Sequence, residues 1–154
     1  MAVLHYDATK REVSILQKLN MPIGSFPVLG HGLAIFFDQL ITLLAPVDAT
    51  VFVREKAVIS HIADTDRLLR IGGVADVALW ATKHKPWYEL APTSVKRIVT
   101  GKGTATKAMV ARSLQPYVGN QVYETDDESD AVAVGIAFLL REGYLDEKRD
   151  TVSE

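Results

Sequence analysis

The sequence predicts an α/β fold, because strand-like and helix-like segments alternate along the chain. Runs of apolar, β-branched and aromatic residues predict strands over Ala2–Tyr6, Glu12–Leu19, Thr50–Arg54 and Trp87–Leu90. Between and after the later runs, apolar residues recur every three or four positions, as they do on one face of a helix. Strands that alternate with helices in this way are typical of a mixed α/β domain.

The composition is that of an ordinary globular chain, with 48% hydrophobic and 23% charged residues. There is no cysteine, so disulfides, thiol chemistry and Cys-ligated zinc are excluded. No stretch reaches the roughly 20 apolar residues of a membrane span, and the first ten residues lack the apolar core of a secretory signal. We expect a cytoplasmic protein with one domain over residues 1–145 and a charged tail, 146–154, that frays.

The first half of the chain is predicted in this order. A polar turn over Asp7–Lys10 joins the first two strands, and a loop rich in Gly and Pro covers Met21–Gly32. A helix runs from Leu33 and is stopped by Pro46. The strand Thr50–Arg54 that follows is expected to be buried, with a carboxylate, Glu55, at its exit.

The second half is predicted to be mainly helical. A long helix covers Asp64–Lys83, and its Gly72-Gly73 pair costs about 2 kcal/mol of helix propensity relative to two alanines. We interpret this cost as a sign of close backbone packing, within the fold or across a dimer. Later helices are predicted from Pro92 to Gly101, from Thr104 to Pro116, and over Asp126–Arg141.

The net charge of -2 hides two segments of opposite sign. The basic segment has no acid and contains Lys96, Arg97, Lys102, Lys107 and Arg112. The acidic segment has no base and contains Glu124, Asp126, Asp127, Glu128 and Asp130. One segment is suited to phosphates and the other to cations, although charge runs of this kind are also typical of solvated faces.

The acidic segment opens an apolar helix. A spacing of three puts Asp127 and Asp130 on one helical face, where two carboxylates can bind a divalent cation such as Mg²⁺. An alternative is purely structural, because Thr125 and Glu128 match a capping box and acids in a first turn complement the helix dipole. On this segment alone both interpretations stay open.

The basic segment joins two short helices at a glycine hinge, Gly101 to Gly103. Hinge amides, helix N-termini and the lysines at 96 and 107 together suit phosphate groups. The spacing and order of these residues differ from a Walker motif.

Three segments together resemble the RuvC-type Holliday-junction resolvases, in order and in spacing. They are Val51-Phe-Val-Arg-Glu55; Val95-Lys96 with Gly101-Lys-Gly-Thr-Ala-Thr-Lys107; and Asp127-Glu-Ser-Asp130-Ala-Val-Ala-Val. The family carries a glutamate that ends a central strand, a V-K…G-x-G…K segment and a D-x-x-D-A helix. The resemblance covers about residues 30–141, and it implies an RNase H-like mixed sheet flanked by helices.

The resemblance also implies residue roles. Glu55, Asp127 and Asp130 match the metal-binding carboxylates, which would use Mg²⁺ or Mn²⁺ to hydrolyse a phosphodiester. Lys107 matches a catalytic basic residue, and the expected DNA-binding residues are Lys96, Arg97, Lys102 and Lys107. The family acts on four-way DNA as a homodimer, and the helix with Gly72-Gly73 falls where its dimer contacts lie.

The family's first-strand aspartate has one candidate here, Asp7. In one alignment Asp7 is that carboxylate; in the other Asp7 lies in the next hairpin turn and the first strand is absent. We favour the second, because Asp7–Lys10 has the composition of a solvated turn. The family's aromatic residue after the glutamate is also replaced, here by Val58, which cannot stack on a base; His61 is the one alternative nearby.

These features lead to three hypotheses. The first is a metal-dependent endonuclease that cuts Holliday junctions and other branched DNA. The second is a non-catalytic RuvC-like protein that binds junctions or serves as a scaffold, with an incomplete carboxylate site. The third is another RNase H-like nuclease, acting on RNA–DNA hybrids or replication intermediates.

Overall fold

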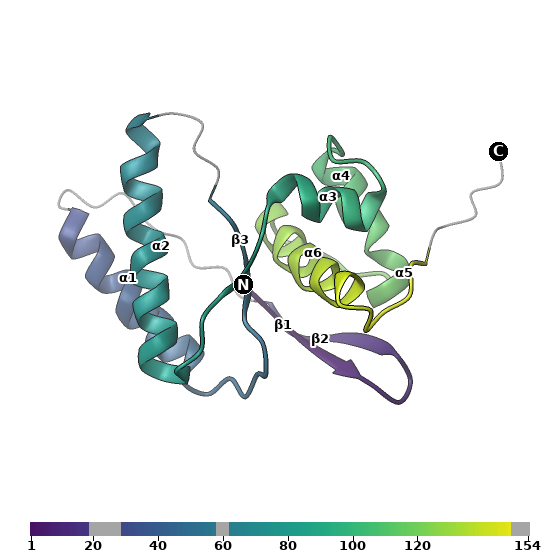
Figure 1. Ribbon diagram of the computed structural model, residues 1–154, viewed down its shortest axis with the longest axis horizontal. Helices are drawn as coiled ribbons and strands as arrows, with labels where there is room; N and C mark the ends of the chain where they lie inside the picture. Colours follow the sequence, from purple (N-terminus) through teal and green to yellow (C-terminus); the bar gives the residue numbers. More distant parts are fainter. Residues whose placement is uncertain (19–28, 58–61, 149–154) are drawn as a thin grey trace. The chain divides into compact units, whose positions relative to one another are not determined.

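The computed structural model of the chain describes residues 1–18, 29–57 and 62–148. The chain divides into two compact units, which are described one at a time. We call Met1–Met21 with Leu90–Glu154 the hairpin unit, and Pro22–Glu89 the two-helix unit. Helices and strands are both present (Figure 1), which confirms the α/β class. The single domain over residues 1–145 stays a prediction.

The hairpin unit begins with two antiparallel strands, β1 (Ala2–Asp7) and β2 (Glu12–Lys18). Both strands and the polar turn between them were predicted correctly. The Asp7 carboxylate accepts hydrogen bonds from the N–H groups of Thr9 (2.9 Å) and Lys10 (3.2 Å), which is the local bonding that favours Asp at the start of a turn. Among the described strands, β1 pairs with β2 and β3 pairs with β4, so the expected sheet is seen as two separate pairs.

The helices of this unit are α3 (Pro92–Thr100), α4 (Lys107–Ser113), α5 (Gln115–Val118) and α6 (Asp126–Arg141). Packing is organised around α6, which contacts α3, α4 and β1. Its apolar face is almost completely buried, with Val132 and Ile136 both at 0% exposure. Burial of such side chains contributes roughly 1.5–3 kcal/mol each, so α6 is the core element of the unit.

The predicted helix from Thr104 to Pro116 was wrong at both ends. The helix begins later, at Lys107, because Thr106 is its N-cap and its hydroxyl accepts the Met109 N–H at 3.3 Å. Pro116 does not end a helix but lies in the first turn of α5, where a missing N–H costs nothing. The helix predicted to end at Gly101 was correct, since Gly101 has a φ of 78° and caps α3.

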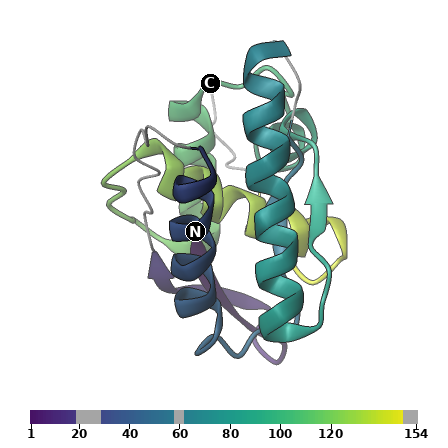
Figure 2. The same cartoon turned by 90° about the vertical axis from the view of Figure 1, so that its left-hand side faces the viewer.

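The two-helix unit contains α1 (Leu29–Leu44), β3 (Val53–Glu55), α2 (Ile62–Lys83) and β4 (Tyr88–Leu90), whose last residue is assigned to the hairpin unit. Figure 2 shows α1 and α2 side by side, and their contact buries Leu40, Leu44, Ala78 and Leu79. The structure starts α1 four residues before the predicted Leu33, so Gly30 and Gly32 lie in its first turn. Each glycine lowers the stability of a helix by roughly 1 kcal/mol relative to alanine, and packing of α1 against α2 outweighs this loss.

Two further expectations for this unit need correction. The strand predicted over Thr50–Arg54 is short, and only Phe52 of that segment is buried while Val51 is 45% exposed. The Gly72-Gly73 pair does not mark close packing within the described fold, because no atom lies within 4 Å of a Cβ built at either residue. The described part of the chain contains no helix that is both long and apolar enough to cross a membrane.

The start of the predicted tail is attached to the hairpin unit. Asp146 forms an ion pair with Arg11 at 3.0 Å, and the Lys148 N–H donates to the Tyr117 hydroxyl at 2.9 Å. Residues 149–154 lie outside the described residues, so fraying beyond Lys148 stays a prediction.

Candidate active site

The start of α6 carries the two carboxylates that the sequence singled out, Asp127 in the first turn and Asp130 directly after it. Asp127 and Asp130 are three residues apart and lie within one helical turn. Asp127 is exposed, and the side chain of Asp130 is 34% exposed. Both carboxylates are therefore accessible at the start of the helix, where the positive end of the helix dipole favours negative charge.

Lys107, the first residue of α4, lies against this turn. Its ammonium nitrogen is 3.5 Å from the Oδ2 atom of Asp130 and 3.5 Å from the Oδ2 atom of Asp126. The charge of Asp130, followed by that of Asp126, raises the pKa of Lys107. The structure thus brings Lys107 and Asp130 together, and it adds Asp126, which the sequence analysis had not assigned to the site.

Glu128 is the buried member of the acidic segment. Its carboxylate, 8% exposed, accepts the Glu124 N–H at 3.0 Å and lies 3.1 Å from the ammonium of Lys18. The hydrogen bond from the Glu124 backbone, and then the charged contact with Lys18, lower the pKa of Glu128. The sequence did contain a signal for this burial, because Glu128 is four and eight residues before the buried Val132 and Ile136.

The capping box considered for this turn is not formed. The side chain of the N-cap residue Thr125 makes no capping hydrogen bond, and its hydroxyl is buried without a partner among the described residues. Glu128 bonds to the N–H of Glu124 and not to that of Thr125. In a capping box the N-cap and N3 residues each bond to the other's backbone N–H. Here the contacts of Glu128 with the Glu124 N–H and with Lys18 take the place of those two bonds.

The basic segment covers α3, the glycine hinge and the start of α4. Arg97, Lys102 and Lys107 are exposed, and Lys96 is half-buried. A Cβ at Gly103 would lie 3.3 Å from the Thr93 carbonyl and 3.5 Å from the Arg97 guanidinium, so the hinge passes close to α3. Two of the hinge amides are already used, because the Gly101 N–H bonds to the Arg97 carbonyl and the Lys102 N–H bonds to the Thr100 hydroxyl.

Glu55 is the last residue of β3, as predicted, and it is exposed in the two-helix unit. Because the two units are described separately, the structure does not relate Glu55 to Asp127 and Asp130. Val58 and His61, considered for the junction contact, lie outside the described residues.

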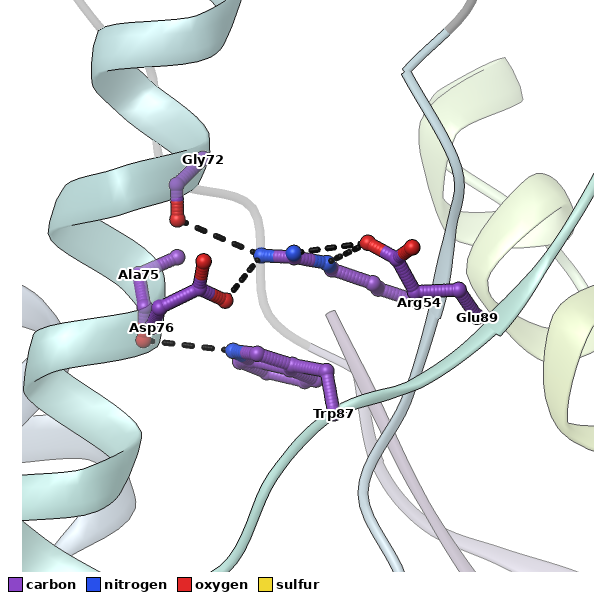
Figure 3. A network of polar contacts seen from close by, with 6 residues as sticks. All are labelled: Arg54, Gly72, Ala75, Asp76, Trp87 and Glu89. Atoms are coloured by element: carbon purple, nitrogen blue, oxygen red, sulfur yellow. Dashed lines mark hydrogen bonds and ion pairs between the residues drawn. The ribbon is translucent and has the colours of Figure 1, made fainter.

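The residue before Glu55 is held by a network that the sequence did not predict (Figure 3). The Arg54 guanidinium donates to Glu89 at 2.7 and 2.9 Å, to the Gly72 carbonyl at 3.2 Å, and lies 2.8 Å from Asp76. It also lies over the Trp87 ring, 5.7 Å from the centroid. Five N–H donors in one plane allow arginine to make all these contacts. The network ties β3 to α2 and β4, and so fixes the strand that ends in Glu55.

Asp7 lies at the other end of the hairpin unit from the acidic turn. Its neighbour Tyr6 donates to the Tyr144 carbonyl at 2.7 Å, beyond the C-terminal end of α6. The opposite end of β1 is near the acidic turn, since the Met1 amino group, whose pKa is lowered by burial, also feels the charges of Asp127 and Glu128. Asp7 is the last residue of β1, and its carboxylate bonds to the turn that follows; the absence of the family's first strand, which the second alignment expects, stays a prediction.

The two acids of α6 fit a divalent cation as a partial ligand set. Mg²⁺ accepts one or two carboxylates and keeps several waters, and accessible oxygens one turn apart meet that need. Within residues 1–18, 29–57 and 62–148, no group of three or more His, Asp or Glu side chains is placed to hold a metal. A third ligand would have to come from outside the acidic turn.

Comparison with known proteins decides the family. The sequence model described as crossover junction endodeoxyribonuclease RuvC matches residues 7–138. This chain belongs to the RuvC family. RuvC of Chlorobium chlorochromatii (strain CaD3) is 30% identical over 134 residues, which cover 77% of this chain and 69% of that protein. RuvC of Carboxydothermus hydrogenoformans is 32% identical over 116 residues, 73% of this chain and 72% of the relative.

Other RuvC proteins extend beyond the matched region. RuvC of Anaeromyxobacter sp. (strain K) is 32% identical over 109 residues, and the match spans 56% of its length. The fold matches that of Thermus thermophilus RuvC, with a TM-score of 0.73, 18% identity, and coverage of 86% of this chain and 82% of that one. A structure of T. thermophilus RuvC in complex with a Holliday junction substrate gives a TM-score of 0.76 at 18% identity, with coverages of 93% and 88%. These matches show the RNase H-like fold of the family.

Proposed function

We propose that this protein is a metal-dependent endonuclease that cuts four-way DNA junctions. The observation that carries the proposal is the acidic start of α6, with Lys107 at 3.5 Å from Asp130, in a chain of the RuvC family. The relatives are named crossover junction endodeoxyribonucleases, and one solved RuvC structure holds a Holliday junction. We also propose that the protein is cytoplasmic, because its proposed substrate is DNA.

Asp127 and Asp130, together with Glu55, are the proposed ligands of Mg²⁺ or Mn²⁺. Carboxylate oxygens are the hard donors that both ions prefer. A divalent cation bound there supplies Lewis-acid chemistry for phosphodiester hydrolysis. The network around Arg54 would support Glu55 by fixing the end of β3.

Lys107 is the proposed catalytic cation. It is paired with Asp126 and Asp130, and the second of these is one of the proposed metal ligands, which supports the assignment. A phosphate that enters would compete for the same ammonium, and Lys107 would neutralise its charge. Lys96, Arg97 and Lys102 on α3 and the hinge are the proposed DNA-binding residues, through contacts to the backbone.

A homodimer is part of the proposal, because a four-way junction has two-fold symmetry. Support comes from α2, which exposes large apolar side chains in the two-helix unit: Leu69 at 57%, Val77 at 59% and Trp80 at 58%. Exposed apolar groups that share one helix are typical of an interface. Trp80→Ser should convert the dimer to a monomer in sedimentation analysis, whereas Leu16→Ser, an equally exposed apolar residue on β2, should not.

The decisive experiment uses a labelled, immobile four-way junction with Mg²⁺. We expect paired symmetric nicks from the wild-type protein and none from Asp130→Asn. Asp146→Asn is the matched control, because this acid is exposed and pairs with Arg11 at the far end of the same unit. An RNA–DNA hybrid added as competitor distinguishes junction cutting from hybrid cutting.

Two results would contradict the proposal. Tight junction binding without cutting, at every Mg²⁺ and Mn²⁺ concentration, would mean that the carboxylate set is incomplete and that the protein only binds junctions. Preferential cutting of the hybrid would assign the site to another kind of RNase H-like nuclease.

A further inference from the structure

Lys18, the last residue of β2, reaches across to the segment that opens α6. Its ammonium pairs with Glu128 at 3.1 Å, donates to the Val122 carbonyl and lies 5.1 Å from the centroid of the Tyr123 ring. The lysine side chain is 22% exposed and that of Glu128 is 8% exposed. One lysine from the hairpin therefore contacts two residues just before α6 and one residue in its first turn.

Glu128 extends the same attachment on the helix side. Its carboxylate accepts the Glu124 N–H at 3.0 Å, so it links the first turn of α6 to the chain before it. The usual N-cap contact is absent, since Thr125 makes no capping bond. The pair of Lys18 and Glu128 therefore links the start of α6 to β2, while Lys107 contacts the same helix start from α4 through Asp126 and Asp130.

Asp127 precedes Glu128 directly, and Asp130 follows two residues later. Any movement of this turn moves both carboxylates, because a helical turn is a rigid unit. An exposed ion pair is worth little and shifts easily, but a largely buried pair with further hydrogen bonds has one geometry. The direction in which the two acids point therefore depends on the buried pair, as well as on the contact of Asp130 with Lys107.

We infer that the Lys18–Glu128 pair positions Asp127 and Asp130 for their divalent cation. This role rests on the proposed function of the two acids as metal ligands. Lys18 and Glu128 are positioning residues, since neither would touch the metal or the DNA. Residues that hydrogen-bond directly to metal ligands typically change metal affinity by about 10- to 100-fold when they are replaced. Lys18 and Glu128 act through the backbone of the turn, so we expect the lower end of that range.

A purely electrostatic effect of the pair on the metal predicts a different result from positioning. The direction in which the metal affinity changes therefore tests the inference. Removal of a cation near two acids should tighten the binding of a metal cation, and removal of an anion should weaken it. Loss of positioning should weaken binding in both cases. Lys18→Met therefore separates the two explanations, because charge predicts tighter binding and loss of positioning predicts weaker binding. The double variant Lys18→Met/Glu128→Gln separates them as well, because it leaves the net charge of the pair unchanged. Glu128→Gln alone weakens binding under either explanation.

The experiment measures Mn²⁺ binding to the DNA-free protein, from the signal of free Mn²⁺ in electron paramagnetic resonance. Circular dichroism confirms that each variant is folded at the temperature used. We expect Lys18→Met, Glu128→Gln and the double variant each to bind Mn²⁺ about tenfold more weakly than wild type. Lys18→Arg, which retains a cation for Glu128, should restore most of the affinity.

Arg11→Met is the matched control. It removes a cation of the same unit that pairs with Asp146 at 3.0 Å, but at the other end of the hairpin. Its Mn²⁺ affinity should equal that of wild type. The double variant leaves neither charge buried without its partner, and its glutamine keeps an oxygen for the Glu124 N–H, so it tests the inference even if Lys18→Met does not fold.

Three results would overturn the inference. Tighter binding by Lys18→Met with an unchanged double variant would mean that the pair acts by charge only. A loss in Arg11→Met as large as in Lys18→Met would mean that the effect is not local. Wild-type protein that binds no Mn²⁺ would remove the proposed function as well, whereas normal wild-type binding with unaffected variants would remove the inference alone.

Discussion

The ammonium of Lys107 lies 3.5 Å from the carboxylate of Asp130, and so joins the first residue of α4 to the N-terminal part of α6. The lysine side chain is 52% exposed, so the pair is open to competition from another anion or cation. A metal ion would compete with Lys107 for Asp130, and a phosphate would compete with Asp130 for Lys107. This contact therefore connects the two charged segments of the sequence.

Replacement of Lys107 tests whether it contacts phosphate. We expect Lys107→Ala to reduce the slope of log affinity against log salt for a four-way junction by about one unit, because one counterion fewer is released. Lys10→Ala, in the β1–β2 turn, should leave the slope unchanged. The measurement is fluorescence anisotropy over a salt series without divalent metal. If Lys107→Ala has the same slope as wild type, Lys107 does not contact phosphate and pairs only with Asp126 and Asp130.

Replacement of Arg54 tests the network behind Glu55. Arg54→Met should lower the free energy of unfolding by about 1–3 kcal/mol, because Asp76, Glu89 and the Gly72 carbonyl all lose a charged donor. Urea unfolding measures this change. The control is Arg70→Met, whose exposed pair with Asp66 at 2.8 Å should contribute about 0.5 kcal/mol or less.

Arg54→Lys should not restore the stability lost in Arg54→Met. A lysine ammonium lacks the planar set of donors that reaches several acceptors at once. Full recovery by lysine would mean that charge alone holds these groups, and that the stacking on Trp87 adds nothing.

The lowered pKa of Glu128 predicts a pH dependence of stability. Its hydrogen bond from Glu124 and its contact with Lys18 favour the ionised form in the folded state. The contribution to stability is therefore complete above the unfolded pKa, about 4.3, and is lost as the pH falls through the lower folded value. The gap in unfolding free energy between wild type and Glu128→Gln should be wide near neutral pH and narrow below about pH 4. A gap that stays constant with pH would contradict this explanation.

The glycine pair of α2 predicts opposite effects on the monomer and the dimer. Gly72→Ala and Gly73→Ala should each stabilise the monomer by about 0.5–1 kcal/mol, because alanine favours helix and nothing lies within 4 Å of the added Cβ. If close packing across the dimer requires these glycines, the same variants should weaken dimerisation in sedimentation equilibrium. Gly30→Ala, also in open space within α1, should leave dimerisation unaffected. Unchanged dimerisation in all three would place the interface elsewhere.

Local sequence patterns predicted most elements correctly. The β1–β2 hairpin, α2, α3, β4 and α6 follow from periodicity and from turn or cap residues such as Asp7 and Gly101, whose effects act within a few positions of the chain. Three predicted helix ends were wrong, at Leu33, Thr104 and Pro116. At Leu33 the packing of α1 against α2 outweighed the low helix propensity of glycine. At Thr104 and Pro116 the N-cap residue Thr106 and the separate helix α5 set the ends instead. The order of the acidic and basic segments was sufficient to indicate the family.

The sequence by itself determined the α/β class, the spacing of Asp127 and Asp130 on one turn, and the membership in the RuvC family that the comparison confirmed. These depend on residue identity at short separation. Only the tertiary structure decided which distant residues meet. It pairs Lys107 with Asp126 and Asp130, and it pairs Lys18 with Glu128. It also joins α2 to β4 through Arg54, and it separates Asp7 from the acidic turn. Such contacts join residues from about 20 to more than 100 positions apart, and charges attract at that separation only after packing has placed their elements side by side.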